Sequence, residues 1–309
     1  MNAPVAAIDC GTNAIRLLVA DVRPDGTLDE RVRLMRIVRL GEGVDRTGEF
    51  APLALERTFA ALDEYADVMR EHGFVRARFV ATSATRDVSN RDAFVDGVHA
   101  RIGIEPEVIT GTEEAALSFT GAVRGLPSAA VALPALVVDI GGGSTEFVLG
   151  SSGPEVSVSV DIGCVRMTER HLHGDPPTTD QITAAQVDID VAVALAGRSV
   201  PFERAASFVG LAGTVTTVAA MAMDLPTYDP TVLHGSVISI EDVSRVATVL
   251  LQMTRAERAA LPYMHPGRVD IIGGGAMVLE SAMRAAGAAE VTVSETDILD
   301  GIVYSLLSK

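Results

Sequence analysis

The sequence has no tryptophan, few other aromatic residues and only two cysteines among its 309 residues. Cys10 and Cys164 lie far apart and belong to no CxxC pair, so neither a disulfide framework nor a zinc site is predicted. Hydrophobic residues make up 48% of the chain, and with so few aromatic side chains the interior must consist mainly of Ala, Val, Leu and Ile. This composition is typical of a globular protein and excludes a disordered one.

Basic residues and long apolar runs are also scarce. The chain carries 25 Lys and Arg, with Lys309 the only lysine, against 41 Asp and Glu, and its formal net charge is −16. An acidic surface disfavours nucleic-acid binding, which depends on neutralising phosphates. The longest apolar run, residues 129–138, contains Pro134 and is too short to span a bilayer. The opening MNAPVAAIDCG lacks the basic region of a signal peptide. We expect a cytoplasmic protein with no nucleic-acid or membrane partner.

The order of the predicted elements indicates an α/β fold of two domains. Residues 5–125 are predicted to form three strands, a helix, a strand, a helix, a strand and a helix, and a connector with Gly, Pro and Ser follows. The pattern then restarts at VVDIGGGSTEFVLG, residues 137–150. We therefore predict a first domain over residues 1–125 and a second over residues 126–309.

Four local predictions can be compared directly with a structure. Residues 31–40 are predicted as a strand, residues 241–260 as one long helix, and VDIIGGG, residues 269–275, as a strand running into glycines. The spacing of Ser294 and Asp297 predicts a capping box at the start of the last helix.

An internal repeat connects the two halves. Residues 8–19, IDCGTNAIRLLV, align with residues 138–149, VDIGGGSTEFVL, so that Asp9 matches Asp139 and each segment continues from a glycine turn into an apolar strand. Such a repeat predicts two copies of one domain, each opening with a β-hairpin. Two glycine-rich turns facing each other across a cleft would form a clamp for phosphate.

The glycine turns have the chemistry of an anion site. Successive glycines expose backbone N–H groups that bind anionic oxygens. Thr12, Asn13, Ser144 and Thr145 add side-chain donors. Two carboxylates beside such a site, Asp9 and Asp139, repel a phosphate unless a cation intervenes. Mg²⁺ favours one or two carboxylates together with waters and phosphate oxygens, and Glu146 would join its shell through water.

VITGTEEAALSF contributes a candidate base. Thr110 and Glu113 have the spacing of a capping box, which leaves Glu114 free about 100° around the helix. A carboxylate at this position would orient and deprotonate water if it faced a phosphate cleft. On the segment alone, the alternative is a solvated acid that is stabilised by the helix dipole.

Two further segments have features of anion sites. LAGTVTTVAAMAM passes from a strand to a helix through Gly213 and Thr214, which would aim the start of the helix at an anion; the alternative is a plain strand–helix turn. Arg86, in the hydroxyl-rich loop ATSATRDVSN, has the length to reach a phosphate, and Arg166 is a weaker candidate.

These motifs together resemble the exopolyphosphatase / guanosine pentaphosphate phosphohydrolase family. The matching segments, in order, are AIDCGTNAIRLLVADV, ATSATRDVSNRDAF, VITGTEEA, VVDIGGGSTEFVLG, LAGTVTTVAA and RVDIIGGG. The resemblance implies two ribonuclease-H-like domains of the actin-like ATPase superfamily with a cleft between them, and a last helix, at about residues 296–309, that packs back on the first domain.

The resemblance also implies roles for particular residues. Glu114 resembles the catalytic base, and Asp139 and Glu146 resemble the acids that hold Mg²⁺ and the attacking water. The residues that resemble the phosphate-binding loops are Gly11, Thr12, Asn13, Arg16, Gly141, Gly142, Gly143, Ser144 and Thr145. CGTNAI departs from the Gly-Ser-Asn-Ser run that the family often has, since Ala14 supplies no hydroxyl.

The expected function is release of terminal orthophosphate from inorganic polyphosphate with Mg²⁺, or Mn²⁺ in its place. Because the sequence lacks the C-terminal HD-type domain of longer members, short chains are the expected substrate. Removal of the 5′ γ-phosphate of pppGpp is the alternative, and the motifs do not separate the two. A kinase-like ATPase and a non-catalytic phosphate or alarmone sensor are more distant alternatives. The resemblance implies a homodimer.

Overall fold

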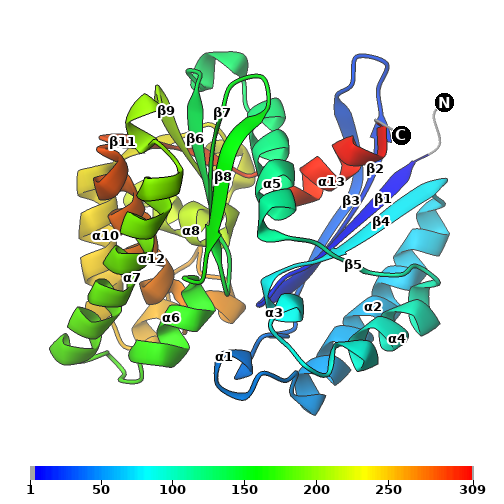
Figure 1. The fold of residues 1–309 in the computed structure, drawn as a ribbon, viewed down its shortest axis with the longest axis horizontal. Coiled ribbons are helices and arrows are strands. Elements are labelled where there is room, and N and C mark those ends of the chain that lie inside the picture. Colours follow the sequence, from blue (N-terminus) through cyan, green and yellow to red (C-terminus); the bar gives the residue numbers. More distant parts are fainter. Residues whose placement is uncertain (1–3, 308–309) are drawn as a thin grey trace.

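The computed structural model describes residues 4–307 and contains two mixed β-sheets that follow one another in the sequence (Figure 1). The first sheet has the strand order β3-β2-β1-β4-β5. Its strands are β1 (Val5–Cys10), β2 (Ala14–Val22), β3 (Leu28–Ile37), β4 (Arg76–Ala81) and β5 (Glu107–Val108). β1, β2 and β3 form an antiparallel meander, and β4 and β5 continue the sheet parallel to β1.

The second sheet repeats this arrangement, with the order β10-β11-β9-β6-β7-β8. Its strands are β6 (Ala135–Ile140), β7 (Thr145–Gly150), β8 (Pro154–Val160), β9 (Ser207–Leu211), β10 (Val237–Ser239) and β11 (Glu290–Ser294). β6, β7 and β8 form the meander, β9 and β11 are parallel to β6, and β10 adds an antiparallel edge. The predicted α/β class with two related halves is confirmed.

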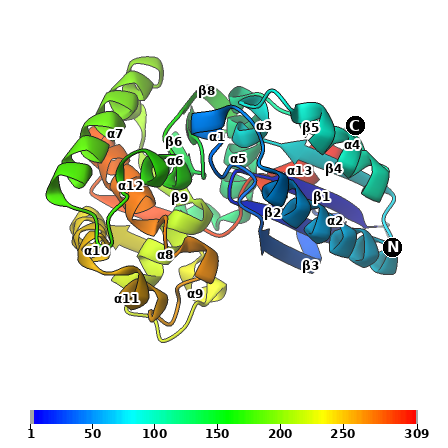
Figure 2. The same ribbon diagram turned by 90° about the horizontal axis from the view of Figure 1, so that it is seen from below.

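Helices cover both faces of each sheet (Figures 1 and 2). The helices of the first half are α1 (Val44–Thr47), α2 (Pro52–His72), α3 (Ser83–Arg86), α4 (Arg91–Ile102) and α5 (Gly111–Gly125). Those of the second half are α6 (Cys164–His171), α7 (Thr179–Ser199), α8 (Ala212–Ala222), α9 (Pro230–Leu233), α10 (Ile240–Gln252), α11 (Arg255–Ala259), α12 (Ile272–Ala286) and α13 (Ile298–Leu307). Side chains of α2 and α4 form a core on one face of the first sheet, and α7, α8, α10 and α12 form the larger core on the outer face of the second.

The layer between the two sheets consists of α5 and α13 (Figure 1). Although α13 follows β11 of the second sheet, it packs on β1 and β2 of the first, and α5 packs on β6, β7 and β8. The two helices meet at glycines: an added Cβ at Gly121 would lie 1.8 Å from the carbonyl oxygen of Asp297, and one at Gly301 2.0 Å from that of Leu117. The backbones of α5 and α13 are therefore in direct contact. The domain division at residue 125 stays a prediction.

Three of the local predictions are wrong in the second half. VDIIGGG is not a strand, because α12 begins at Ile272 and includes all three glycines. Added Cβ atoms would lie 3.0 Å from Thr168 Oγ1 at Gly274 and 2.4 Å from Thr214 Oγ1 at Gly275, so these glycines let α12 approach α6 and α8. The long helix predicted over residues 241–260 is two helices, because Thr254 opens α11 with a capping box of its own.

The third of these concerns the last helix, whose predicted capping box is displaced by three residues. Asp297 caps α13 by accepting a hydrogen bond from the Leu299 amide, and Asp300 accepts one from the Asp297 amide. The hydroxyl of Ser294 bonds instead to the carbonyl oxygen of Thr296. The predicted helix extends to residue 309, and residues 308 and 309 lie outside the described part of the chain.

The remaining prediction concerns a strand of the first sheet. The strand expected over residues 31–40 is present as β3, shifted to Leu28–Ile37. Three elements of the second half, α6, α9 and β10, were not predicted. Within residues 4–307, no helix combines the length and the hydropathy needed to cross a membrane.

Candidate active site

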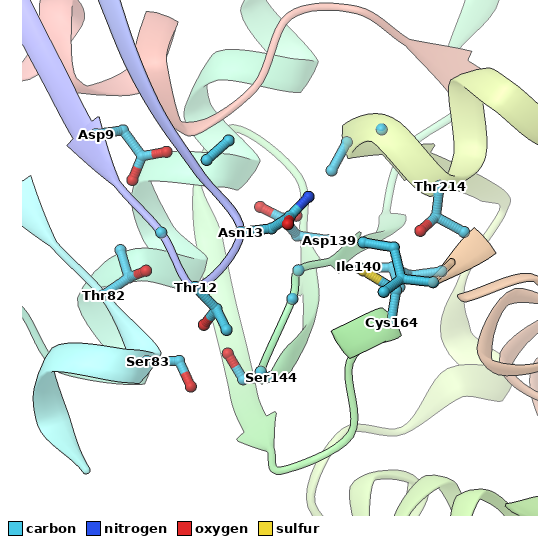
Figure 3. Close-up of a pocket in the computed structure, with 18 of the residues that line it drawn as sticks. Asp9, Thr12, Asn13, Thr82, Ser83, Asp139, Ile140, Ser144, Cys164 and Thr214 are labelled. Atoms are coloured by element: carbon cyan, nitrogen blue, oxygen red, sulfur yellow. The ribbon is translucent and has the colours of Figure 1, made fainter. Parts of the chain in front are cut away.

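One cavity lies at the turns of the β1–β2 and β6–β7 hairpins, and its water-accessible volume is about 130 Å³ (Figure 3). Most of the predicted site residues line it: Asp9, Gly11, Thr12, Asn13, Arg16, Glu114, Asp139, Gly141, Gly142, Gly143, Ser144, Gly213 and Thr214. The residues come from both sheets, from α5 and from the start of α8. The fold therefore brings together motifs that are up to two hundred residues apart in the sequence.

The two hairpin turns have the same internal geometry. In the first, the Gly11 amide donates to the carbonyl oxygen of Ala14 at 2.9 Å, and in the second the Gly141 amide donates to that of Ser144 at 3.0 Å. The turns also touch each other, because an added Cβ at Gly142 would lie 2.8 Å from Cβ of Thr12. The predicted pair of turns is thus one continuous structure across the two halves of the protein.

Carbonyl groups of the second turn are held by residues of α6. The amides of Cys164 and Val165, at the start of α6, donate to the carbonyl oxygens of Gly141 and Gly142 at 3.0 and 2.9 Å. Arg166, the weaker anion candidate, instead donates from Nε to the carbonyl oxygen of Gly143 at 2.7 Å. These hydrogen bonds occupy carbonyl groups of the turn and leave its amides for a ligand, as an anion-binding nest requires.

The first turn is held in the same way. The carbonyl oxygen of Asn13 accepts hydrogen bonds from the amides of Val38 and Arg39, and that of Thr12 accepts one from Gly41 at 2.9 Å. Among residues 4–307, no hydrogen-bond acceptor is found for the amides of Thr12, Asn13, Gly142 and Gly143. These N–H groups are therefore free to bind a ligand.

The start of α8 closes a third side of the cavity. Ala212 has a φ of 71°, in the left-handed region that residues with a side chain seldom adopt, and this turns the chain sharply from β9 into the helix. Gly213 follows it and lets Arg268 lie close to the chain, because an added Cβ would lie 2.5 Å from the guanidinium of Arg268. Arg268 lines the cavity but was not predicted; its position at the head of RVDIIGGG was the available signal.

The repeat places two pairs of charged side chains at equivalent positions. Asp9 lies opposite Arg16 in the β1–β2 ladder, and Asp139 lies opposite Glu146 in the β6–β7 ladder. The first pair is an ion pair, in which Arg16 Nε and Nη2 donate to Asp9 Oδ2 at 3.0 and 2.6 Å. The second pair is two carboxylates, so the two halves of the repeat differ in charge at the same place.

Burial and like charge disfavour ionisation of the acids in the second half. The pKa of Asp139 is raised to about 7, chiefly by burial; the hydrogen bond from Ser118 lowers it, and the charges of Asp297 and Glu114 add to the rise. Burial, together with the charges of Glu114 and Asp139, also holds the pKa of Glu146 well above its ordinary value. Such raised values are typical of a site that holds a cation when it works.

Glu114 and Ser118 are one turn apart on α5 and face β6 and β7. Ser118 Oγ donates to Asp139 Oδ2 at 2.6 Å, and Arg86 Nη1 donates to Glu114 Oε2 at 2.7 Å. Burial raises the pKa of Glu114, and Arg86 lowers it. Thr110 caps the helix with a hydrogen bond to the Glu113 amide, but the Glu113 carboxylate binds Arg78 and not the Thr110 backbone. The helix start thus leaves Glu114 at the cavity, as expected.

A sequence model of the Ppx/GppA phosphatase family matches residues 18–309. The chain belongs to this family. It is 52% identical to Exopolyphosphatase 2 of Mycobacterium tuberculosis, with 98% of each chain covered. Among solved structures, an exopolyphosphatase-like protein is 46% identical with a TM-score of 0.93 and coverage of 98% of this chain and 97% of that one. The Ppx/GppA family member of Aquifex aeolicus is 28% identical with a TM-score of 0.80, covering 99% and 98% of the two chains. These matches identify the chain as a phosphoanhydride hydrolase.

Three predicted site residues do not line the cavity of this Ppx/GppA protein. Arg86 is bound to Glu114 and to the carbonyl oxygen of Ile109. Thr145 donates its hydroxyl to the carbonyl oxygen of Ile162 at 2.6 Å and is fully buried. Glu146 is buried behind the cavity and accepts a hydrogen bond from Ser159 at 2.7 Å.

The acids at the cavity fit a divalent cation that phosphate oxygens help to hold. Among the described residues, no group of three or more His, Cys, Asp and Glu side chains is arranged around one metal position. Mg²⁺ does not need such a group, because it takes one or two carboxylates and completes its shell with water and phosphate. Asp9 Oδ1 is buried without a hydrogen-bond partner, and burial raises the pKa of Asp139 and so disfavours its ionised form. Both observations fit a cation at this place.

Proposed function

We propose that this protein is an exopolyphosphatase that releases orthophosphate from the end of inorganic polyphosphate. The observation that carries the proposal is one cavity lined by two glycine turns, a buried glutamate, Glu114, and two aspartates, Asp9 and Asp139. Family membership and 52% identity to a protein named Exopolyphosphatase 2 support the same activity.

In this proposal the turns bind the terminal phosphates. The amides of Thr12 and Asn13 and those of Gly142 and Gly143 offer hydrogen bonds from the two adjoining turns. Arg16 and the hydroxyls of Ser144 and Thr214 add donors. Phosphoryl transfer requires mainly positioning and electrostatic stabilisation of the phosphoryl oxygens, and donors held rigidly by the two sheets supply both.

Glu114 is the proposed general base. Its carboxylate accepts a proton from a water molecule as the water oxygen attacks the terminal phosphorus in line with the anhydride bond. That P–O bond breaks, and the bridging oxygen leaves with the shortened chain. Arg86 fixes one carboxylate oxygen, Oε2, and Oε1 remains to orient the water. Burial keeps the pKa of Glu114 above its ordinary value, which makes it a stronger base near neutral pH.

The proposed cofactor is Mg²⁺, with Mn²⁺ as a substitute. Asp9 and Asp139 would hold it, and Glu146, which lies behind Asp139, would act through water. When bound, the ion neutralises charge on the phosphate oxygens. Ser118 orients the Asp139 carboxylate by its hydrogen bond.

Short polyphosphate is the proposed substrate class. The cavity walls carry several carboxylates, and the protein has a net charge of −16, so a long polyanion would be repelled wherever it left the cavity. The pppGpp alternative shares the triphosphate end and is decided by the assay below. A cytoplasmic location and a homodimer stay predictions.

The deciding experiment measures orthophosphate release from tripolyphosphate, long polyphosphate, pppGpp and ATP, with Mg²⁺ or with EDTA. We expect Mg²⁺-dependent release that is fastest on the short polyphosphate. Glu114→Gln should lower kcat by ~10²-fold or more, because it removes the base. Glu113→Gln, on the neighbouring position, is the control and should change kcat little, since its carboxylate binds Arg78 away from the cavity. Full activity in Glu114→Gln would refute the mechanism. A preference for pppGpp would show that pppGpp, and not short polyphosphate, is the substrate.

A further inference from the structure

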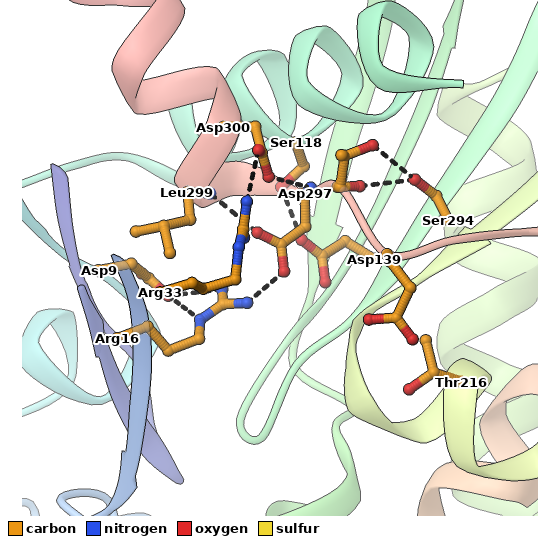
Figure 4. Close-up of polar contacts among 12 residues, drawn as sticks. Asp9, Arg16, Arg33, Ser118, Asp139, Thr216, Ser294, Asp297, Leu299 and Asp300 are labelled. Atoms are coloured by element: carbon orange, nitrogen blue, oxygen red, sulfur yellow. Dashed lines mark hydrogen bonds and ion pairs between the residues drawn. The ribbon is translucent and has the colours of Figure 1, made fainter. Parts of the chain in front are cut away.

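Arg16 is held from two sides by carboxylates of different segments (Figure 4). Its Nε and Nη2 atoms donate to Asp9 on β1, and its Nη1 atom donates to Asp297. A guanidinium has five N–H donors, so these three hydrogen bonds leave two for a ligand. The direction of those two donors depends on both carboxylates, because a guanidinium is planar and rigid.

Asp297 does not depend on Arg16 for its own position. It lies in the link between β11 and α13, where its Oδ1 atom accepts the Leu299 amide at 2.9 Å as the cap of α13. The Asp297 amide donates to Asp300 at 3.0 Å, and Asp300 is paired with Arg33 of β3 at 2.6 Å. Its backbone is pressed against Gly121 of α5, the helix that carries Glu114. Asp297 is therefore a fixed point in the layer between the two sheets.

A second cavity, with a water-accessible volume of about 470 Å³, begins on the other side of Arg16. Arg16 lines both cavities, whereas Asp297 lines only the second. Met35 and Arg268 also border both cavities, and Tyr228 and Tyr263 line the second one further away. The guanidinium thus has open space behind it, and the contact with Asp297 is what restrains it on that side.

We propose that Asp297 is a positioning residue for the proposed reaction: it holds the Arg16 guanidinium at the boundary of the two cavities, so that its two free donors face the terminal phosphate. This proposal rests on the proposed function. Without the carboxylate of Asp297, Arg16 keeps its bonds to Asp9 but loses the contact that fixes its Nη1 atom, so its two free donors no longer keep one direction. A misplacement of about 1 Å at a reacting group costs up to ~10²-fold in rate.

The test is a double-mutant cycle of Asp297→Asn and Arg16→Lys. Asparagine is as good a helix cap as aspartate, so its Oδ1 still accepts the Leu299 amide and α13 stays in place. Lysine keeps the charge of Arg16 but is a single point donor that cannot bridge Asp9 and Asp297. Asp300→Asn is the matched control, because it changes the same helix start without touching Arg16.

We expect Asp297→Asn to lower kcat/KM for tripolyphosphate by at least ~10-fold in the wild type and by less than ~2-fold in Arg16→Lys. Asp300→Asn should have the same effect in both backgrounds. Equal losses from Asp297→Asn in both backgrounds, or no loss in the wild type, would overturn the proposal. The rise in melting temperature that tripolyphosphate causes is measured over the same cycle and should show the same dependence. That readout needs no turnover, so it decides the role of Asp297 even if the wild type releases no phosphate.

Discussion

The pH dependence of stability in the metal-free protein is a direct test of the buried Asp139. Burial raises its pKa from 3.8 to about 7. Because the folded protein keeps a proton that the unfolded chain has already lost, the stability from this group is fully present below about pH 4. It is lost as the pH rises through 7. Asp139→Asn should remove this loss, since asparagine does not ionise and its side-chain oxygen still accepts the hydrogen bond of Ser118.

The size of the effect follows from the pKa. Between pH 5 and about pH 7 the folded wild type keeps a proton that the unfolded chain has lost, and each of these two pH units costs about 1.4 kcal/mol. The free energy of unfolding should therefore fall by about 3 kcal/mol more in the wild type than in Asp139→Asn. In a protein of 309 residues, that difference corresponds to a melting temperature lower by roughly 5 °C.

The assay is thermal and urea unfolding of both proteins in EDTA at pH 5 and pH 8. The advantage of Asp139→Asn over the wild type should be small at pH 5 and about 3 kcal/mol larger at pH 8. Adding Mg²⁺ at pH 8 should restore stability to the wild type but not to the variant, which lacks the anionic ligand. Parallel stability curves for the two proteins between pH 5 and pH 8 in EDTA would refute the reasoning that Asp139 is held as a costly buried anion.

Two alanine substitutions test close packing, with Gly153→Ala as their common control because nothing lies within 4 Å of a Cβ added there. Gly143→Ala puts a methyl group 2.7 Å from Ser83 Oγ and should lower kcat/KM by ~10²-fold with little change in melting temperature; unchanged kinetics would contradict the proposed role of the turn. Gly121→Ala drives a methyl group into the backbone of Asp297 and should cost about 3 kcal/mol in urea unfolding, and a cost equal to that of the control would show that the helix crossing adjusts.

The hairpins and the main polar residues of the cavity could be predicted because their signals are local. A glycine turn between an apolar strand that ends in Asp9 or Asp139 and a second apolar strand specifies its own geometry. The repeat of that pattern then predicts that the two turns are equivalent. Glu114 could be predicted for a similar reason, since helical spacing separates it from the capping positions.

The contacts that depend on distant segments could not be predicted in the same way. Arg86 has the length and charge of a phosphate ligand, and only the fold shows that Glu114 occupies its guanidinium. Asp297 is 281 residues from Arg16 in the sequence, and nothing near it suggests a role in the cavity. The glycines of α12 were misassigned because a strand followed by a turn and a tightly packed helix start have the same local pattern.

The place of α13 has a consequence for how the protein is made. One face of the first sheet, which includes Val5 and Leu18, is covered by Ile302 and Val303, near the end of the chain. During synthesis, domains generally fold in order from the N-terminus. Here the first half emerges early but keeps an apolar face bare until the last helix leaves the ribosome. Nascent chains that stop before residue 298 should therefore bind chaperones through this apolar face, and both halves should mature together only after α13 has been made.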